Sequence, residues 1–266
     1  MTAINDTMAF LIDLDGTIYA GEQLIEGAKE AIELLQHYQL PFVFVSNRGN
    51  YSRQTCLKKL SRFGIHVPEQ QIVLSSTVAA HYLVNHDPLS KLWVLGNDEL
   101  KFELSSHGLA LAKQPQEAGW LVITLHEQLT YEELNAAFRA VHAGARIIAT
   151  NADKTFPRHD GNCIDVAGMI GAIAYSTGKE PEVIVGKPHH HIAQYALNIL
   201  NVSPQQCIVI GDSMNSDLML ARHFNMRSAI VLSGSTSLES YKEHELKADW
   251  ISPNILSFVK QLIGQI

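Results

Sequence analysis

The residues from Met8 to Ile12 form a short apolar run that leads into two carboxylates, Asp13 and Asp15, and then into a Gly16–Thr17 turn. An uninterrupted apolar run of this length is typical of a strand covered on both faces in a parallel sheet. Side chains two residues apart start on the same face of a strand. Asp13 and Asp15 therefore bring two negative charges close together, and a cation, a partner or a shared proton is needed to offset their repulsion. The segment therefore predicts a parallel α/β sheet with a polar site at the carboxyl end of this strand.

Three further apolar runs also end in polar groups. Residues 42–45 lead to Ser46, Asn47 and Arg48; residues 183–185 lead to Gly186 and Lys187; residues 207–210 lead to Gly211, Asp212 and then Asp217. Because the carboxyl ends of parallel strands meet at one edge of a sheet, these groups are expected to converge. Each has a simpler explanation alone, as a capping residue or a surface lysine. Their joint occurrence in this order favours a catalytic site.

In this order the four segments resemble the motifs DxDGT, Ser/Thr-Asn, Gly-Lys-Pro and GDxxxxD of the haloacid dehalogenase superfamily of aspartate-nucleophile phosphatases. The segments at residues 25–28, 129–134, 149–153 and 231–236 are similar to its NagD / p-nitrophenylphosphatase-like branch. The resemblance extends from about residue 8 to about residue 240. It implies a Rossmann-like parallel-sheet core with an inserted α/β cap domain of class IIA.

The resemblance implies a role for each carboxylate of the first and last motifs. Asp13 is expected to be the nucleophile and a metal ligand. Asp15 is expected to be the general acid/base, with its backbone carbonyl on the metal. The side chain of Asp212 would complete the protein ligands, and Asp217 would orient the lysine or the metal-bound waters. Carboxylate and carbonyl oxygens suit a hard divalent cation, and Mg²⁺ is the expected cofactor.

The same resemblance implies a set of phosphate-binding groups. Ser46 and the amide of Asn47 would hydrogen-bond the transferring phosphoryl oxygens, and Lys187 would pair with the phosphate and with Asp13. Lysine serves as a point-charge binder of phosphate. Arg48 stands where the branch often has a second asparagine, and it would add a cation near the phosphate entrance.

The alternation of apolar runs with helical stripes predicts how the chain is organised. Residues 1–78 and 183–266 are expected to form the catalytic core, and residues 79–182 an inserted α/β cap domain. Helices are predicted at residues 26–38, 52–63 and 130–141 and from Ser203–Pro204 onward, and strands at residues 72–74, 92–95, 120–123 and 146–149.

Specificity is assigned to the predicted cap. The core groups contact only the phosphoryl unit that all monoesters share, so discrimination must come from residues that reach the rest of the substrate. By their place in the resembled cap, Asn151, Asp153, Arg158 and Asp165 are expected to face the substrate. His126 and Cys163 depart from the branch pattern there, which leaves the identity of the substrate open.

Composition limits the class of partner. The chain has 266 residues and a net charge of −7, which argues against nonspecific nucleic-acid binding. No apolar stretch approaches the ~20 residues of a membrane span, and the opening segment Met1–Thr7 is polar, so neither a membrane anchor nor a signal peptide is expected. Three cysteines without metal-like spacing are consistent with a reducing cytoplasm. The expected partner is a small phosphorylated metabolite, and the resemblance allows a homodimer.

The sequence thus predicts a Mg²⁺-dependent phosphatase that hydrolyses a small phosphomonoester, such as a sugar phosphate or a nucleotide, through an aspartyl-phosphate intermediate. Two alternatives stay open on the same scaffold. A phosphotransferase or mutase would return the phosphoryl group to a hydroxyl acceptor. A non-catalytic regulator that binds a phosphometabolite would normally have lost a motif carboxylate or Lys187, and all of them are present.

Overall fold

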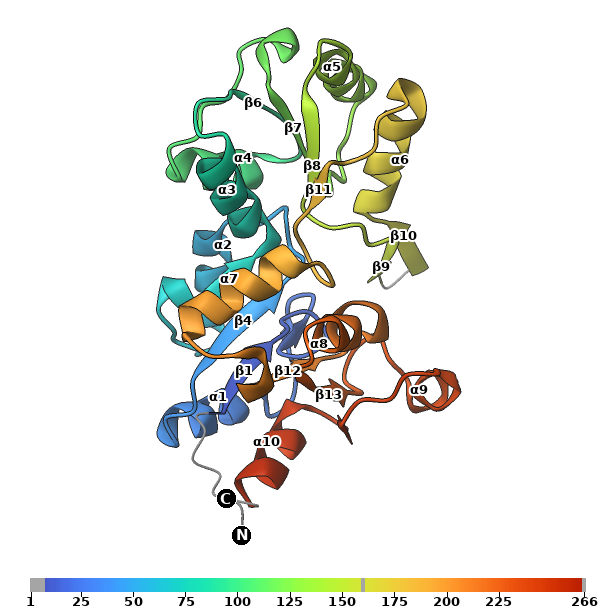
Figure 1. The fold of residues 1–266 in the computed structure, drawn as a ribbon. Helices are drawn as coiled ribbons and strands as arrows, with labels where there is room; N and C mark the ends of the chain where they lie inside the picture. Colours follow the sequence, from blue (N-terminus) through green and yellow to red (C-terminus); the bar gives the residue numbers. More distant parts are fainter. Residues whose placement is uncertain (1–7, 159–160, 265–266) are drawn as a thin grey trace. The chain divides into compact units, whose positions relative to one another are not determined.

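The structure is a computed structural model that describes residues 8–158 and 161–264. The polar opening segment Met1–Thr7 lies outside the described residues. The described chain divides into two compact units. The first contains residues 8–46, 57–73 and 187–264, and the second contains residues 47–56 and 74–186. Figure 1 shows the elements of both units.

The first unit contains a six-stranded sheet in the order β14-β13-β12-β1-β4-β5. These strands are β1 (Ala9–Ile12), β4 (Phe42–Ser46), β5 (Ile72–Leu74), β12 (Cys207–Gly211), β13 (Arg227–Val231) and β14 (Trp250–Ser252). The pairings of β1 with β12 and β4, of β12 with β13 and of β13 with β14 are all parallel. The central strands β1, β4 and β12 are buried along their whole length, as the apolar runs predict.

Helices cover this sheet in two packed pairs (Figure 1). Helix α1 (Ala28–His37) packs against α10 (Ile255–Ile263), and α7 (His190–Leu200) packs against α8 (Met219–His223). The remaining elements are α9 (Leu238–Glu243), the 3₁₀ turns η1 (Glu69–Gln71) and η3 (Pro204–Gln206), the π-helical turn η4 (Met214–Leu218) and the hairpin of β2 (Tyr19–Ala20) and β3 (Gln23–Leu24). Helix α2 (Arg53–Arg62) begins in the second unit and ends in the first.

The second unit contains a four-stranded parallel sheet in the order β11-β8-β7-β6. Its strands are β6 (Leu92–Leu95), β7 (Trp120–Ile123), β8 (Arg146–Ala149) and β11 (Val183–Ile184). Its helices are α3 (Ser75–His86), α4 (Asp98–Ser106), α5 (Tyr131–His142) and α6 (Val166–Thr177), with the 3₁₀ turn η2 (Pro115–Glu117). A core of aliphatic side chains lies between this sheet, α5 and α6.

The predicted fold class is confirmed, because both sheets are parallel and alternate with helices. The prediction of a longer helix from Ser203–Pro204 onward is wrong. Ser203 does cap a turn with Gln206, but this turn is the short η3, because the apolar residues of β12 follow at once. The strands β9 (Thr155–Arg158) and β10 (Gly161–Ile164) form an antiparallel pair that the sequence pattern does not predict.

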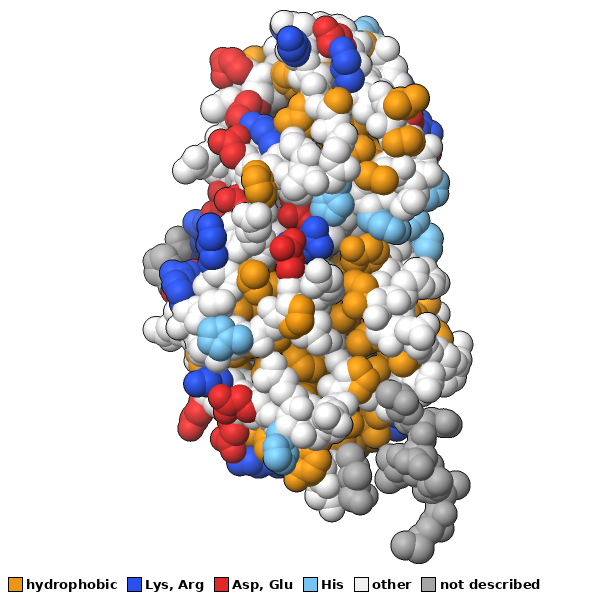
Figure 2. All heavy atoms as spheres, turned by 90° about the vertical axis from the view of Figure 1, so that its left-hand side faces the viewer, with side chains coloured by type: hydrophobic (Ala, Val, Ile, Leu, Met, Phe, Trp, Pro, Cys, Tyr) orange, Lys and Arg blue, Asp and Glu red, His pale blue; other side chains and the backbone are white. Residues whose placement is uncertain are grey.

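One face of the described chain carries acidic and basic side chains together (Figure 2). On the face shown in Figure 2 the acidic and basic side chains are interspersed over both halves of the view. None of the helices in residues 8–158 and 161–264 combines the length and the hydrophobicity that crossing a membrane requires.

Candidate active site

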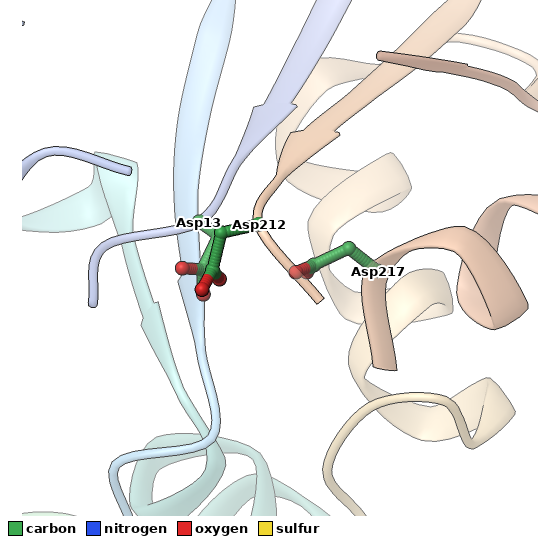
Figure 3. Close-up of side chains that lie close together, drawn as sticks. All are labelled: Asp13, Asp212 and Asp217. Carbon is green, nitrogen blue, oxygen red and sulfur yellow. The ribbon is translucent and has the colours of Figure 1, made fainter. Parts of the chain in front are cut away.

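The site begins where β1 and β12 end side by side. Ile12 pairs with Ile210, and the backbone N–H of Asp13 donates to the carbonyl of Ile210 at 2.8 Å. The register therefore brings Asp13, the first residue after β1, beside Asp212, the first residue after β12. Figure 3 shows the two carboxylates lying together beyond these strand ends. The convergence that the sequence predicts follows directly from parallel pairing.

Asp217 reaches the same place from the π-helical turn η4 that follows β12. The side chain of Ser213 caps this turn through the backbone N–H of Ser216, and the N–H of Ser213 donates to Asp217 Oδ2 at 3.1 Å. Figure 3 shows the Asp217 carboxylate pointing toward the other two. Oxygens of Asp13, Asp212 and Asp217 lie within 4.8 Å of one another, and all three residues are buried.

Lys187 joins two of these carboxylates. Its Nζ donates to Asp13 Oδ1 at 2.5 Å and to Asp217 Oδ1 at 2.7 Å. Its side chain is 3% exposed. Burial alone would lower the pKa of Lys187, but the charges of Asp13 and Asp217 raise this pKa above its ordinary value. The lysine is therefore a buried ammonium that neutralises part of the carboxylate cluster.

The cluster keeps an excess of negative charge. Burial raises the pKa of Asp13 well above its usual value, the Lys187 ammonium opposes this rise, and Asp217 and Asp212 add to it. Burial, followed by the charge of Asp217, raises the pKa of Asp212 to about 6. The buried Asp13 Oδ2 has no hydrogen-bond partner among the described residues. An unpaired carboxylate oxygen beside a second carboxylate is a donor set that fits a hard divalent cation.

Asp212 is held in one position by its neighbours. The backbone N–H of Ser235 donates to Asp212 Oδ2 at 2.5 Å, and the hydroxyls of Ser235 and Thr236 donate to the Asp212 carbonyl at 3.1 and 2.5 Å. A Cβ on Gly16 or on Gly234 would overlap the Asp212 carboxylate. These contacts of Ser235 and Thr236 were not predicted from the sequence, although hydroxyls after another strand of the same sheet were an available signal.

Asp15 lies on the turn that leads from β1 into the β2–β3 hairpin. The N–H of Gly16 donates to the carbonyl of Tyr19 at 2.8 Å, and Asp15 forms a β-bridge with Tyr19. Gly16 has a φ of +82°, a conformation that favours glycine. Ser46 is the last residue of β4, next to β1, and is 2% exposed. The first unit thus brings together the predicted Asp13, Lys187, Asp212 and Asp217 at the sheet edge that also carries Asp15 and Ser46.

The other predicted residues belong to the second unit, and three of them are bonded to one another. Asn47 donates through Nδ2 to Asp153 Oδ2 at 2.8 Å. Asn151 donates through Nδ2 to the Asn47 carbonyl at 2.8 Å, and its Oδ1 accepts from the Asp153 N–H at 2.9 Å. Ser75 Oγ also donates to the Asn47 carbonyl. Asn151 is 3% exposed. Asn151, Asp153 and Ser75 thus hold the segment that follows β4 in place through their bonds to Asn47.

Arg48, Arg158 and Asp165 have separate surroundings in the second unit. The Arg48 guanidinium lies 5.4 Å from the centroid of the Tyr51 ring. Arg158 forms an ion pair with Glu127, and its side chain is 45% exposed. Asp165 caps α6 by accepting from the Val166 N–H, and burial raises its pKa to about 6. Of the four predicted specificity residues, Arg158 is thus exposed, while Asn151 and Asp165 are buried.

A parallel α/β sheet whose edge carries buried carboxylates and one buried lysine defines an enzyme site rather than a structural junction. Comparison with known proteins agrees. Residues 10–110 match the family model for haloacid dehalogenase-like hydrolases, and residues 184–258 match a second model described as HAD-hydrolase-like.

The relatives are phosphatases. The sugar-phosphatase AraL of Bacillus subtilis is 52% identical over 225 residues, which are 85% of this chain and 83% of that protein. The structure of a p-nitrophenyl phosphatase from Archaeoglobus fulgidus superposes with a TM-score of 0.91 at 31% identity, covering 96% of this chain and 99% of the other. A putative nagD protein superposes with a TM-score of 0.88 at 25% identity, covering 97% and 100%. The chain belongs to the haloacid dehalogenase-like hydrolases, in the NagD / p-nitrophenylphosphatase branch, and it is a phosphatase.

Proposed function

We propose that this phosphatase hydrolyses small phosphomonoesters, sugar phosphates foremost, through a phosphoryl-enzyme formed on Asp13. The observation that carries the proposal is the buried and unpartnered Asp13 Oδ2 beside Asp212 and Lys187. A free carboxylate oxygen is available for attack on phosphorus, whereas Oδ1 is held by the lysine. The similarity to a sugar phosphatase at 52% identity supports the sugar-phosphate class.

The reaction divides into two steps. In the first, Asp13 Oδ2 attacks the phosphorus atom, the ester bond breaks, and Asp15 donates a proton to the leaving alkoxide oxygen. In the second, Asp15 takes a proton from a water molecule, whose oxygen attacks the phosphorus of the aspartyl-phosphate and releases Asp13 and inorganic phosphate. Lys187 keeps its charge throughout and neutralises anionic oxygens near Asp13. Ser46 and the Asn47 amide are proposed to bind phosphoryl oxygens.

The proposed cofactor is Mg²⁺, held by the side chains of Asp13 and Asp212 and the backbone carbonyl of Asp15. When bound, it would neutralise the repulsion between the carboxylates and the phosphate dianion. The fit rests on the oxygen-only donor set of three neighbouring buried carboxylates. Burial and the neighbouring carboxylates raise the pKa values of Asp13 and Asp212, and a bound cation would oppose this rise. Asp217 is bonded to Lys187 and Ser213 and is assigned to orienting the lysine.

Released phosphate tests the function. The purified protein is incubated with a panel of sugar phosphates, nucleotides and other small phosphomonoesters, with Mg²⁺ and after chelation, and with glycerol as an added acceptor. Hydrolysis of sugar phosphates at kcat/KM values in the usual enzyme range of about 10⁴ M⁻¹ s⁻¹ or more is expected. Transfer to glycerol that outruns phosphate release would instead favour a phosphotransferase.

Removal of the metal is expected to abolish turnover reversibly. Chelation followed by Mg²⁺ should restore activity, and Ca²⁺ should inhibit it because its larger and less regular shell suits in-line displacement poorly. Mg²⁺ should also raise the melting temperature of the wild type, since it binds the folded state only. In Asp212→Asn this increase should disappear. Full activity after exhaustive chelation would exclude the proposed cofactor.

Substitutions in the second unit should separate two roles. Arg158→Ala is expected to change the ranking of substrates while p-nitrophenyl phosphate turnover stays within about tenfold, which corresponds to roughly 1.4 kcal/mol. Asn151→Ala and Asp153→Ala should lower kcat/KM for every substrate by a similar factor, because both residues hold Asn47. Kinetics on five or more phosphomonoesters measure this. A changed ranking in Asp153→Ala would return that residue to the specificity set predicted from sequence.

A further inference from the structure

Tyr19, the first residue of β2, is bonded to the turn that carries Asp15. The Tyr19 carbonyl accepts from the N–H of Gly16, and the Tyr19 N–H donates to the carbonyl of Leu14 at 3.1 Å. Tyr19 also forms the β-bridge with Asp15. Its side chain is fully buried. Tyr19 therefore bonds to the backbone on both sides of Asp15 and anchors β2 through a buried ring.

Lys59, on the part of α2 that belongs to the first unit, lies against this ring. Its Nζ is 4.0 Å from the centroid of the Tyr19 ring and 3.3 Å from Glu22 Oε1, in the tight turn between β2 and β3. The Lys59 side chain is only 4% exposed. An ammonium withdrawn from water to this extent is costly unless a counter-charge or an aromatic face compensates it. Both are present here, and both belong to the hairpin.

Arg62 provides an internal comparison on the same helix. It also binds Glu22, at 3.0 Å, but its side chain is 65% exposed. A solvated ion pair of this kind contributes little to stability. The ring contact and the burial thus distinguish Lys59 from a neighbour that shares its carboxylate partner.

We propose that Lys59 is a positioning residue for Asp15: its buried ammonium clamps Tyr19 and Glu22, and the hairpin in turn fixes the turn that presents the general acid. The inference rests on the role proposed for Asp15. Lys59 touches neither substrate nor metal in this proposal. Its effect should therefore appear only in steps that need the proton of Asp15.

Leaving groups of different basicity make this effect measurable. The p-nitrophenolate anion is stable and departs without a proton, whereas an alkoxide from a sugar or alkyl phosphate requires one. The parameter kcat/KM reports the steps up to departure of the leaving group, so hydrolysis of the phosphoryl-enzyme does not enter it. A misplaced general acid should therefore lower kcat/KM for alkyl phosphates selectively, while a general loss of structure lowers it for all substrates.

The experiment measures kcat/KM for p-nitrophenyl phosphate and for a series of phenyl and alkyl phosphates. In Lys59→Met the values for alkyl phosphates should fall about tenfold or more, since small misplacements of a catalytic group are costly, while p-nitrophenyl phosphate stays within about threefold. Lys59→Arg, which keeps the charge and can also lie on an aromatic face, should recover most of the loss. Arg62→Met, the matched control, should match the wild type on every substrate.

Two further variants distinguish a failure of the role inferred for Lys59 from a failure of the role proposed for Asp15. Tyr19→Leu removes the ring while Lys59 is intact, and it should show the same leaving-group dependence. Asp15→Asn should show that dependence in stronger form, on the order of 100-fold for alkyl phosphates. A uniform loss or no loss in Lys59→Met, with the expected selectivity in Asp15→Asn, would overturn this inference alone. An absence of selectivity in Asp15→Asn would overturn the proposed role of Asp15 itself.

Discussion

Asp13→Asn is expected to reduce turnover to the background rate, a loss of about four orders of magnitude or more, while the protein stays folded. The amide keeps the shape of the side chain and can still accept a hydrogen bond from Lys187, but it lacks the anionic oxygen that is proposed to attack phosphorus. Removal of a buried charge near Asp212 and Asp217 also relieves repulsion, so the melting temperature should not fall appreciably. Phosphate release and circular dichroism measure the two effects.

The phosphoryl-enzyme gives this prediction a direct readout. Acid quenching during turnover should trap a base-labile phosphate adduct on the wild-type peptide that contains Asp13, and Asp13→Asn should trap none. Asp98→Asn is a suitable control, because the Asp98 side chain is 96% exposed and forms an ion pair with the nearby Lys101. A folded Asp13→Asn variant with full activity would refute the proposed nucleophile.

Lys187→Met should lose both activity and stability. It leaves Asp13 and Asp217 buried without their shared cation, and breaking a buried ion pair in this way typically costs about 3–5 kcal/mol. The measurement is urea unfolding in the presence of a chelator, so that no divalent cation substitutes for the ammonium. Lys187→Arg should recover part of the stability but little turnover, because a planar guanidinium cannot reproduce the two short contacts.

The stability loss in Lys187→Met should depend on pH. Asp13 and Asp212 have folded-state pKa values above the reference value of 3.8, and removal of the ammonium raises them further. A carboxyl group with a raised folded-state pKa favours folding when protonated, so its unfavourable contribution grows as pH rises from about 4 through 6. Below the wild-type pKa values these groups are protonated in both folded proteins and contribute equally, so the difference between variant and wild type should be small near pH 4 and should grow as the pH rises above about 6. A difference independent of pH would contradict this account.

The strand ends of both units were predictable, because the carboxyl ends of parallel strands meet at one edge of a sheet. Residues 92–95, 120–123 and 146–149 form strands with the predicted bounds, and Asp13 and Asp212 meet as the apolar runs before them imply. The apolar runs alone indicate strands that are buried on both faces of a parallel sheet. What the runs establish is which residues reach the edge of the sheet.

Contacts between distant segments were not predictable in this way. Asn47 and Asp153 are 106 residues apart, and no periodicity relates them. The resemblance alone placed Asp153 among the substrate-facing residues, and the bond to Asn47 is known only from the structure. Lys59 is one of several basic residues in α2, and nothing in the sequence marks it as the one that is buried. The antiparallel pair of β9 and β10 is short and exposed, so its residues lack the alternation that marks a half-buried strand.

The absence of side chains at Gly16 and Gly234 has a consequence for how this enzyme can change over generations. Any larger residue at either position would push the Asp212 carboxylate aside, so if Asp212 has its proposed role, most amino-acid replacements at these codons are expected to lower activity. An exposed side chain such as that of Arg158 meets no such limit. Heritable variation that survives selection should therefore accumulate in the second unit, and libraries for new substrates should be built there with both glycine codons held constant.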